Sequence, residues 1–148
     1  MKKFVFALTC IFLFACAAGQ QSKPAFEGVT FDTGKRRKAV MNAIIKVADD
    51  EGFSVGTVNQ KKGIIVCKPR KMLNGVLMEK IQGGSWNVQT KSSTFNHRIQ
   101  FSAHVSQDGV VRLRTLVMAT DETHSVDREK SEKLTAYYQK KIMAAVRP

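Results

Sequence analysis

The sequence predicts an α+β protein, a two-layer sandwich in which an antiparallel sheet of about five strands packs against two helices. Two segments carry apolar residues at the helical spacing of three and four. Several others alternate apolar and polar residues, as strands with one buried face do. In chain order the pattern is α-β-β-(unclear)-β-β-β-α, which favours a one-sided sheet covered by helices. The expected helices are residues 33–51 and 127–146, and the expected strands are residues 53–58, 63–68, 85–91, 95–106 and 111–119.

The first helix has one apolar stripe, formed by Val40, Ala43, Ile44, Val47 and Ala48. Asp32 or Thr33 is expected to cap its start, and Gly52 to end it in a left-handed conformation. Its charges oppose the helix dipole, because bases crowd the positive end and residues 49–51 are acidic. The basic residues are Lys35, Arg36, Arg37 and Lys38. This order suggests a surface that meets an anionic partner, and a merely solvated helix start is the alternative.

The middle of the chain is less regular. Residues 59–63 form a turn between two strands, and Pro69 ends the second strand. Residues 70–84 are interrupted by glycines, so we expect a loop that carries a short strand or a helical turn. Residues 29–31 could add a short β segment before the first helix.

The clearest pattern is a hairpin of residues 95–106 and 111–119. A three-residue loop, residues 107–109, sets Val105 opposite Val111 and keeps the apolar faces matched. This loop predicts a type I turn with a bulge in which Gly109 has a positive φ. Three basic side chains then line the outer, wet face of the hairpin: Arg98, Arg112 and Arg114. The second helix is expected to bury Leu134, Tyr137, Tyr138, Ile142, Ala145 and Val146.

The first 15 residues have the layout of an export signal, with two lysines, an apolar run over residues 4–14 and a small-residue exit. The run is shorter than the roughly 20 residues that span a bilayer. Its end, Leu13-Phe14-Ala15-Cys16, resembles the lipobox of bacterial lipoproteins. That resemblance implies lipid attachment at Cys16, and Ala17 after it implies an anchor in the outer membrane that faces the periplasm. Cleavage after Ala17, giving a soluble secreted domain, is the alternative.

This layout divides the chain into a signal peptide (1–15), a lipidated cysteine with a flexible tether (16–31) and a single α+β domain (32–148). Removal of the signal leaves 22 basic against 12 acidic residues, a net charge of +10. In an exported protein this charge points to anionic lipid, lipopolysaccharide or an acidic envelope protein rather than to nucleic acid, and a generally basic, solvated surface without such a partner is the alternative. Cys67 lies in an apolar run and is expected to be buried and structural.

No motif for catalysis, metal or cofactor binding is present in the sequence. His97 shares the apolar parity of its strand, so we expect it at the edge of the core. The layout from Arg37 through Gly52 and Phe53 to Gly63 and Ile64 resembles small lipoprotein domains of the helix-grip kind, such as the C-type lipoprotein of the outer-membrane barrel-assembly machinery. That resemblance implies a scaffold or accessory role without catalysis. A pocket for a small hydrophobic ligand, roofed by residues 72–81, is a second hypothesis.

Overall fold

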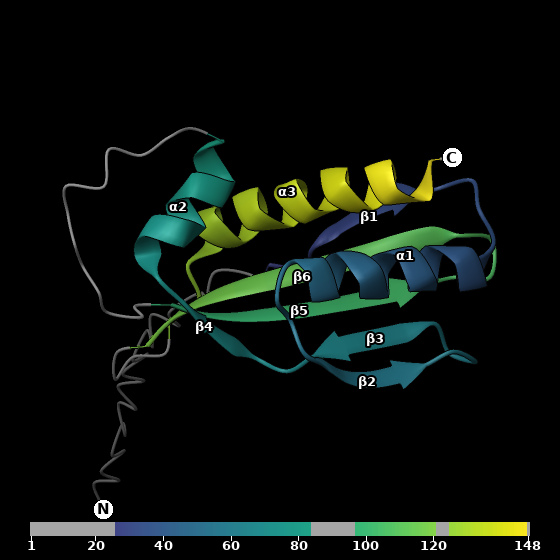
Figure 1. The fold of residues 1–148 in the computed structure, drawn as a ribbon, viewed down its shortest axis with the longest axis horizontal. Coiled ribbons are helices and arrows are strands. Elements are labelled where there is room, and N and C mark those ends of the chain that lie inside the picture. Colours follow the sequence, from purple (N-terminus) through teal and green to yellow (C-terminus); the bar gives the residue numbers. More distant parts are fainter. Residues whose placement is uncertain (1–25, 84–96, 121–124, 148) are drawn as a thin grey trace, which may run out of the picture.

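The computed structural model describes residues 26–83, 97–120 and 125–147, and it confirms the α+β class with two packed layers (Figure 1). The strands are β1 (Val29–Asp32), β2 (Val55–Asn59), β3 (Ile64–Cys67), β4 (Arg70–Met72), β5 (His97–Val105) and β6 (Val110–Ala119). The helices are α1 (Arg37–Asp50), α2 (Asn74–Gln82) and α3 (Arg128–Val146). The strand expected at residues 85–91 lies outside the described residues.

The sheet is antiparallel, in the order β1-β6-β5-β3-β2, and β4 also pairs with β5. β3 and β4 follow one another along the same side of β5. Ile64 pairs with His104, and Arg70 pairs with Ile99. The chain therefore advances six residues from β3 to β4 while the partner residues on β5 are only five residues apart. The extra residue falls near Pro69, which has no N–H to give to the ladder.

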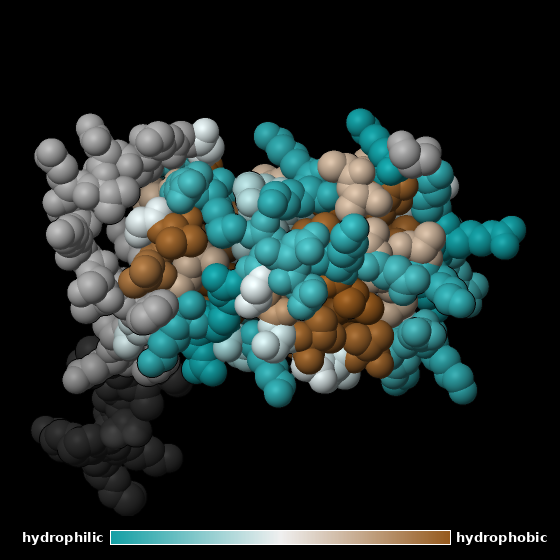
Figure 2. Space-filling view, in the orientation of Figure 1, coloured by the Kyte–Doolittle hydropathy of each residue, from teal (hydrophilic) through white to brown (hydrophobic). Residues whose placement is uncertain are grey.

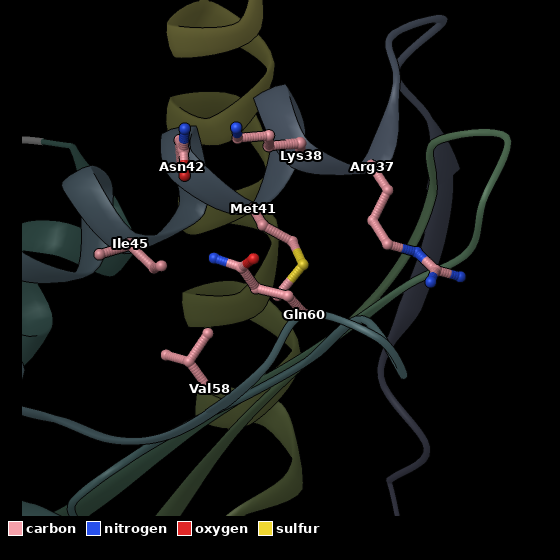
Figure 3. Close-up of a pocket in the computed structure, with 7 residues that line it drawn as sticks. All are labelled: Arg37, Lys38, Met41, Asn42, Ile45, Val58 and Gln60. Carbon is pink, nitrogen blue, oxygen red and sulfur yellow. The ribbon is translucent and has the colours of Figure 1, made fainter.

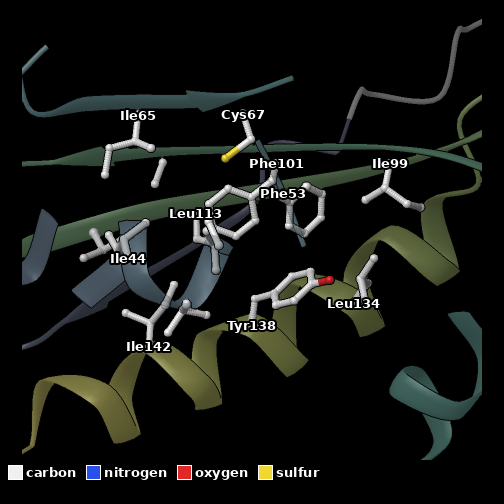
Figure 4. Packing of buried hydrophobic residues seen from close by; sticks show 14 of the residues in the cluster. Ile44, Phe53, Ile65, Cys67, Ile99, Phe101, Leu113, Leu134, Tyr138 and Ile142 are labelled. Carbon is white, nitrogen blue, oxygen red and sulfur yellow. The ribbon is translucent and has the colours of Figure 1, made fainter. Parts of the chain in front are cut away.

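α1 and α3 cover one face of the sheet, and α2 packs beside α3 (Figure 1). Between the layers lie the rings of Phe53, Phe101 and Tyr138, with centroids 5.4 to 5.7 Å apart (Figure 4). Such tilted and edge-to-face contacts are the favoured geometry for aromatic pairs. Leu77 of α2 is fully buried in the same cluster. The segment that could roof a ligand pocket therefore contributes Met72 and Leu77 to the core, and the ligand hypothesis stays a prediction.

The start of α1 differs from the expectation. The helix begins at Arg37, and its N-cap, Arg36, provides no side-chain hydrogen bond. The prediction that Asp32 or Thr33 caps the helix is wrong. β1 holds Asp32 opposite Val110, so the chain must turn before the helix can begin. Asp32 Oδ1 accepts from the Gly34 amide instead, at 2.9 Å.

The other end of α1 and the hairpin match their predictions. Gly52 follows α1 with φ of 75°, in the left-handed region. Val105 pairs with Val111, and Gly109 has φ of 93° in the turn between β5 and β6. The chain joins the fold earlier than residue 32, the predicted boundary of the domain. Phe26 is buried and β1 pairs with β6, so residues 26–31 belong to the folded body rather than to the tether.

α3 follows the predicted stripe for Leu134, Tyr138 and Ile142, which are fully buried, but Ala145 is exposed. Two buried hydroxyl groups complete its inner face. Ser131 Oγ accepts from the Val117 amide at 2.9 Å, and Thr135 Oγ1 accepts from the Thr115 amide at 3.1 Å. β1 pairs with β6 only as far as Leu113. The hydroxyls of α3 therefore satisfy backbone donors of β6 beyond the end of β1.

Candidate binding surfaces

Three segments meet at one end of the sheet: the start of α1, the β2–β3 turn and the β5–β6 turn (Figure 1). Arg37 Nη1 donates to the Lys61 carbonyl at 2.8 Å, which joins the first two segments. The Thr33 hydroxyl donates to the Gly109 carbonyl at 2.8 Å, which joins the chain before α1 to the third. We call this surface the basic end, and it comprises Lys35, Arg36, Arg37, Lys38, Lys61 and Lys62.

The basic end combines the predicted quartet with two lysines from a distant part of the sequence. All of its residues are exposed except Arg37, which is half-buried and holds the β2–β3 turn. None of the ion pairs found among the described residues includes a member of the basic end. Asp108 of the β5–β6 turn is an acid within the electrostatic influence of this surface, because its pKa is lowered by hydrogen bonds from the Ser106 hydroxyl and from backbone amides, and by the charge of Arg37. The surface is therefore strongly cationic at pH 7.

The three arginines predicted on the outer face of the hairpin do not form one group. Arg112 and Arg114 lie together on β6, opposite His104 and Ser102 of β5. They border a shallow depression of about 420 Å³ on the face of the sheet that lacks α1 and α3. Arg98 lies six residues from His104 along β5, or about 20 Å at the rise of a strand. It belongs to the other end of the sheet, where it pairs with Lys71.

A groove between α1 and the edge strand β2 was not predicted from the sequence (Figure 3). Its volume is about 200 Å³. Met41 and Ile45 of α1 and Val58 of β2 provide the apolar lining, and Val58 is 39% exposed. The remaining lining residues are polar or basic: Arg37, Lys38, Asn42 and Gln60. The helix and the strand were each predicted from the sequence, but only the tertiary structure places α1 and β2 side by side.

A second charged cluster lies at the opposite end of α1. The Glu51 carboxylate is buried, and it accepts hydrogen bonds from Lys80, Lys141 and the Tyr137 hydroxyl, the last at 3.0 Å. Burial alone would raise the pKa of Glu51, but the hydrogen bonds from Lys141 and Lys80 outweigh it and lower that pKa. The cluster ties the end of α1 to α2 and α3, so we interpret it as structural. No local pattern in the sequence marks it.

Two single residues match their predictions. His97 is 8% exposed at the edge of the core, and its Nε2 lies 3.4 Å from Lys130 Nζ. Burial and the nearby Lys130 charge lower the pKa of His97, so its imidazole is neutral at pH 7. Cys67 is buried, and burial raises the pKa of its thiol to about 11. This thiol stays protonated and has the character of a core residue.

Comparison of the chain with protein-family models, curated proteins and solved structures found no match. None of the three described helices has the length and apolarity needed to cross a membrane. Within residues 26–83, 97–120 and 125–147, no three histidine, cysteine or acidic side chains are grouped so that they could hold a metal ion. Cys16, the predicted site of lipid attachment, lies outside these ranges.

Proposed function

We propose that this chain is a lipid-anchored protein of the cell envelope that binds an anionic partner through its basic end and has no catalytic activity. The partner is an acidic envelope protein or an anionic lipid or lipopolysaccharide. The observation that carries the proposal is the convergence of six basic residues from two distant segments on one surface, away from the described ion pairs.

The helix start adds to the attraction for anions. α1 carries no acidic residue in its first turn and no side-chain cap at Arg36. Its first amide groups and its dipole, equivalent to about half a positive charge, therefore act in the same direction as the basic side chains. Placing bases there costs a few tenths of a kcal/mol per charge. A bound anion would offset that cost.

The proposed anchor keeps the domain close to a membrane surface. Acylation of Cys16 with more than one chain would give firm attachment, because each buried CH₂ contributes about 0.8 kcal/mol. Ten residue steps separate Cys16 from Phe26, the first described residue, which limits the span to about 35 Å. At that distance an anionic lipid headgroup or a membrane-associated protein is within reach of the domain.

The anchor is tested by the intact mass of the protein extracted from membranes. We expect the mass of residues 16–148 plus acyl groups. A mass that begins at Ala18 without lipid would contradict the anchor and leave a soluble secreted domain with a diffusible partner.

Binding at the basic end is tested in a Cys16→Ser background, so that acyl chains cannot cause retention. The variant Lys35→Glu/Arg36→Glu/Lys38→Glu should lose most of its sedimentation with phosphatidylglycerol vesicles, lipopolysaccharide or an acidic protein. Arg37 is left in place because it holds the β2–β3 turn. The control, Lys46→Glu/Lys68→Glu/Lys140→Glu, changes net charge equally at exposed positions elsewhere. Equal retention of both variants would contradict a specific role for the basic end.

A further inference from the structure

We infer that the groove between α1 and β2 binds an extended acidic segment of a partner protein, which adds as a strand to the outer edge of β2. This inference rests on the proposed function, because Arg37 and Lys38 of the basic end line part of the groove. It narrows the anionic partner to a polypeptide and assigns a place to its backbone and side chains.

The backbone of β2 is suited to strand addition. Among the described strands β2 pairs with β3 alone, so its other side presents unpaired N–H and C=O groups. Edge strands are usually protected by charged side chains or proline. The sequence of β2, Val-Gly-Thr-Val-Asn, contains neither. Its register irregularity lies between Val55 and Thr57, which leaves the segment from Thr57 to Asn59 regularly paired on its inner side.

The groove above this edge offers a place for one side chain of an added strand. Val58 pairs with the buried Ile65, so its side chain is on the face of the sheet that α1 covers. Figure 2 shows a hydrophobic patch on this side of the molecule where α1 lies next to β2. The groove volume of about 200 Å³ is below the 300–1,000 Å³ typical of drug-sized ligand pockets. A row of backbone hydrogen bonds with a side chain seated in a pocket is a known mode of peptide recognition.

Charge selects the occupant. Arg37 and Lys38 line the groove, and Lys61 and Lys62 follow β2 in the adjoining turn. Two copies of the mature chain joined edge to edge would each carry a net charge of +10, so electrostatic repulsion opposes their association. An acidic strand that carries one apolar residue would contact the cations with its carboxylates and the apolar lining of the groove with its apolar side chain. That lining is formed by Met41, Ile45 and Val58. The geometry therefore favours an acidic partner over a second copy.

The test begins with selection of a random library of 12-residue peptides against the full chain. We expect peptides in which aspartate or glutamate alternates with aliphatic residues. Binding of the selected peptide, measured by calorimetry, should weaken by about tenfold or more in Val58→Lys and in Lys38→Glu. Thr57→Lys and Lys46→Glu are the matched controls. They make similar charge changes on the other face of β2 and at an α1 residue outside the groove lining, and they should keep affinity within about threefold.

The backbone contribution is tested with the same peptide carrying N-methyl groups at alternate residues. Methylation of the residues that face β2 should abolish binding, whereas methylation of the other set should be tolerated. If neither set of N-methyl groups weakens binding of the peptide, strand addition is overturned. If the chain self-associates through Val58 and the peptide competes with this self-association, the groove belongs to an interface with a second copy and the inference is overturned.

The vesicle assay distinguishes the two proposals. Val58→Lys leaves the basic end intact and should sediment with anionic vesicles as the wild type does. If the library yields no enriched peptide while retention still depends on Lys35, Arg36 and Lys38, only the groove inference is overturned. If the chain binds neither peptide nor anion, both proposals fail.

Discussion

The substitution Glu51→Gln removes one buried negative charge and nearly preserves the shape of the side chain. Glu51 is 7% exposed and accepts hydrogen bonds from three groups on two different helices. The neutral amide would keep an oxygen acceptor but present an NH₂ group toward a lysine ammonium. We expect the variant to fold and to be less stable.

The size of the loss follows from the exposure of the partners. A hydrogen bond to a buried charge contributes about 1.5–3 kcal/mol. Lys141 is 46% exposed, so its share is discounted to that of a surface pair, below about 1 kcal/mol. Lys80 is 21% exposed and retains more of its value. Together these give a decrease of about 2–3 kcal/mol in the free energy of unfolding, or about 8–12 °C in Tm for a domain of this size.

The effect should depend on pH in a defined direction. The pKa of Glu51 in the folded protein is lower than its ordinary value of 4.5. The carboxylate therefore contributes its full stabilisation above the ordinary pKa, and this contribution is lost as the pH falls through the lowered folded-state pKa. The difference in stability between wild type and Glu51→Gln should be largest at pH 7 and should narrow progressively below about pH 4.5.

Urea unfolding at several pH values measures this difference directly. Glu132→Gln is the control, because Glu132 forms an i,i+4 pair with Arg128 in which both side chains are about half exposed. It should cost about 0.5 kcal/mol or less. If Glu51→Gln were as stable as Glu132→Gln, or if its deficit stayed constant down to pH 3, the buried cluster would not stabilise the fold as inferred.

Two further predictions concern the core and the turns. Tyr138→Phe should raise Tm by about 4 °C in thermal unfolding, because the Tyr138 hydroxyl is buried and finds no hydrogen-bond partner among the described residues. A lower Tm would show that this hydroxyl does form a hydrogen bond in the folded protein. Gly109→Ala should destabilise by about 2 kcal/mol in urea unfolding, because a Cβ there would lie 1.9 Å from the Lys35 carbonyl at a φ of 93°. Gly75→Ala, with no atom within 4 Å of the added Cβ, should be neutral or slightly stabilising, and equal losses in the two variants would contradict this assignment.

The hairpin could be predicted in detail because its information is local. Side chains alternate with a period of two, so only an odd loop keeps Val105 opposite Val111 and both apolar faces on one side. The same parity placed Arg98, Arg112 and Arg114 on the outer face correctly. The parity could not show that Arg98 is distant from the other two arginines, because it gives the face of the sheet on which a side chain lies and not its position along the strand.

For residues 70–84 the sequence predicted only a short strand or a helical turn, and the full length of α2 could not be predicted because the stability of this helix is not local. A nine-residue helix is shorter than the 12–15 residues that are marginally stable alone, and Gly75 weakens it further. Tertiary contacts hold it: Leu77 is buried in the core, and Lys80 reaches Glu51 at the end of α1. The inner face of α3 posed a similar problem. Ser131 and Thr135 interrupt its apolar stripe, and their role is visible only beside the amides of β6.

The two ends of α1 differ in how their unfavourable charges are compensated. Both ends oppose the helix dipole, as the order of charges in the sequence predicts. At the end of α1, Glu51 is neutralised internally by lysines from α2 and α3. At the start, the described ion pairs provide no equivalent for Lys35, Arg36 or Lys38. Folding therefore compensates the buried charge of Glu51 at one end of the helix and leaves Lys35, Arg36 and Lys38 at the other end uncompensated, where the proposed anionic partner would supply the missing charge.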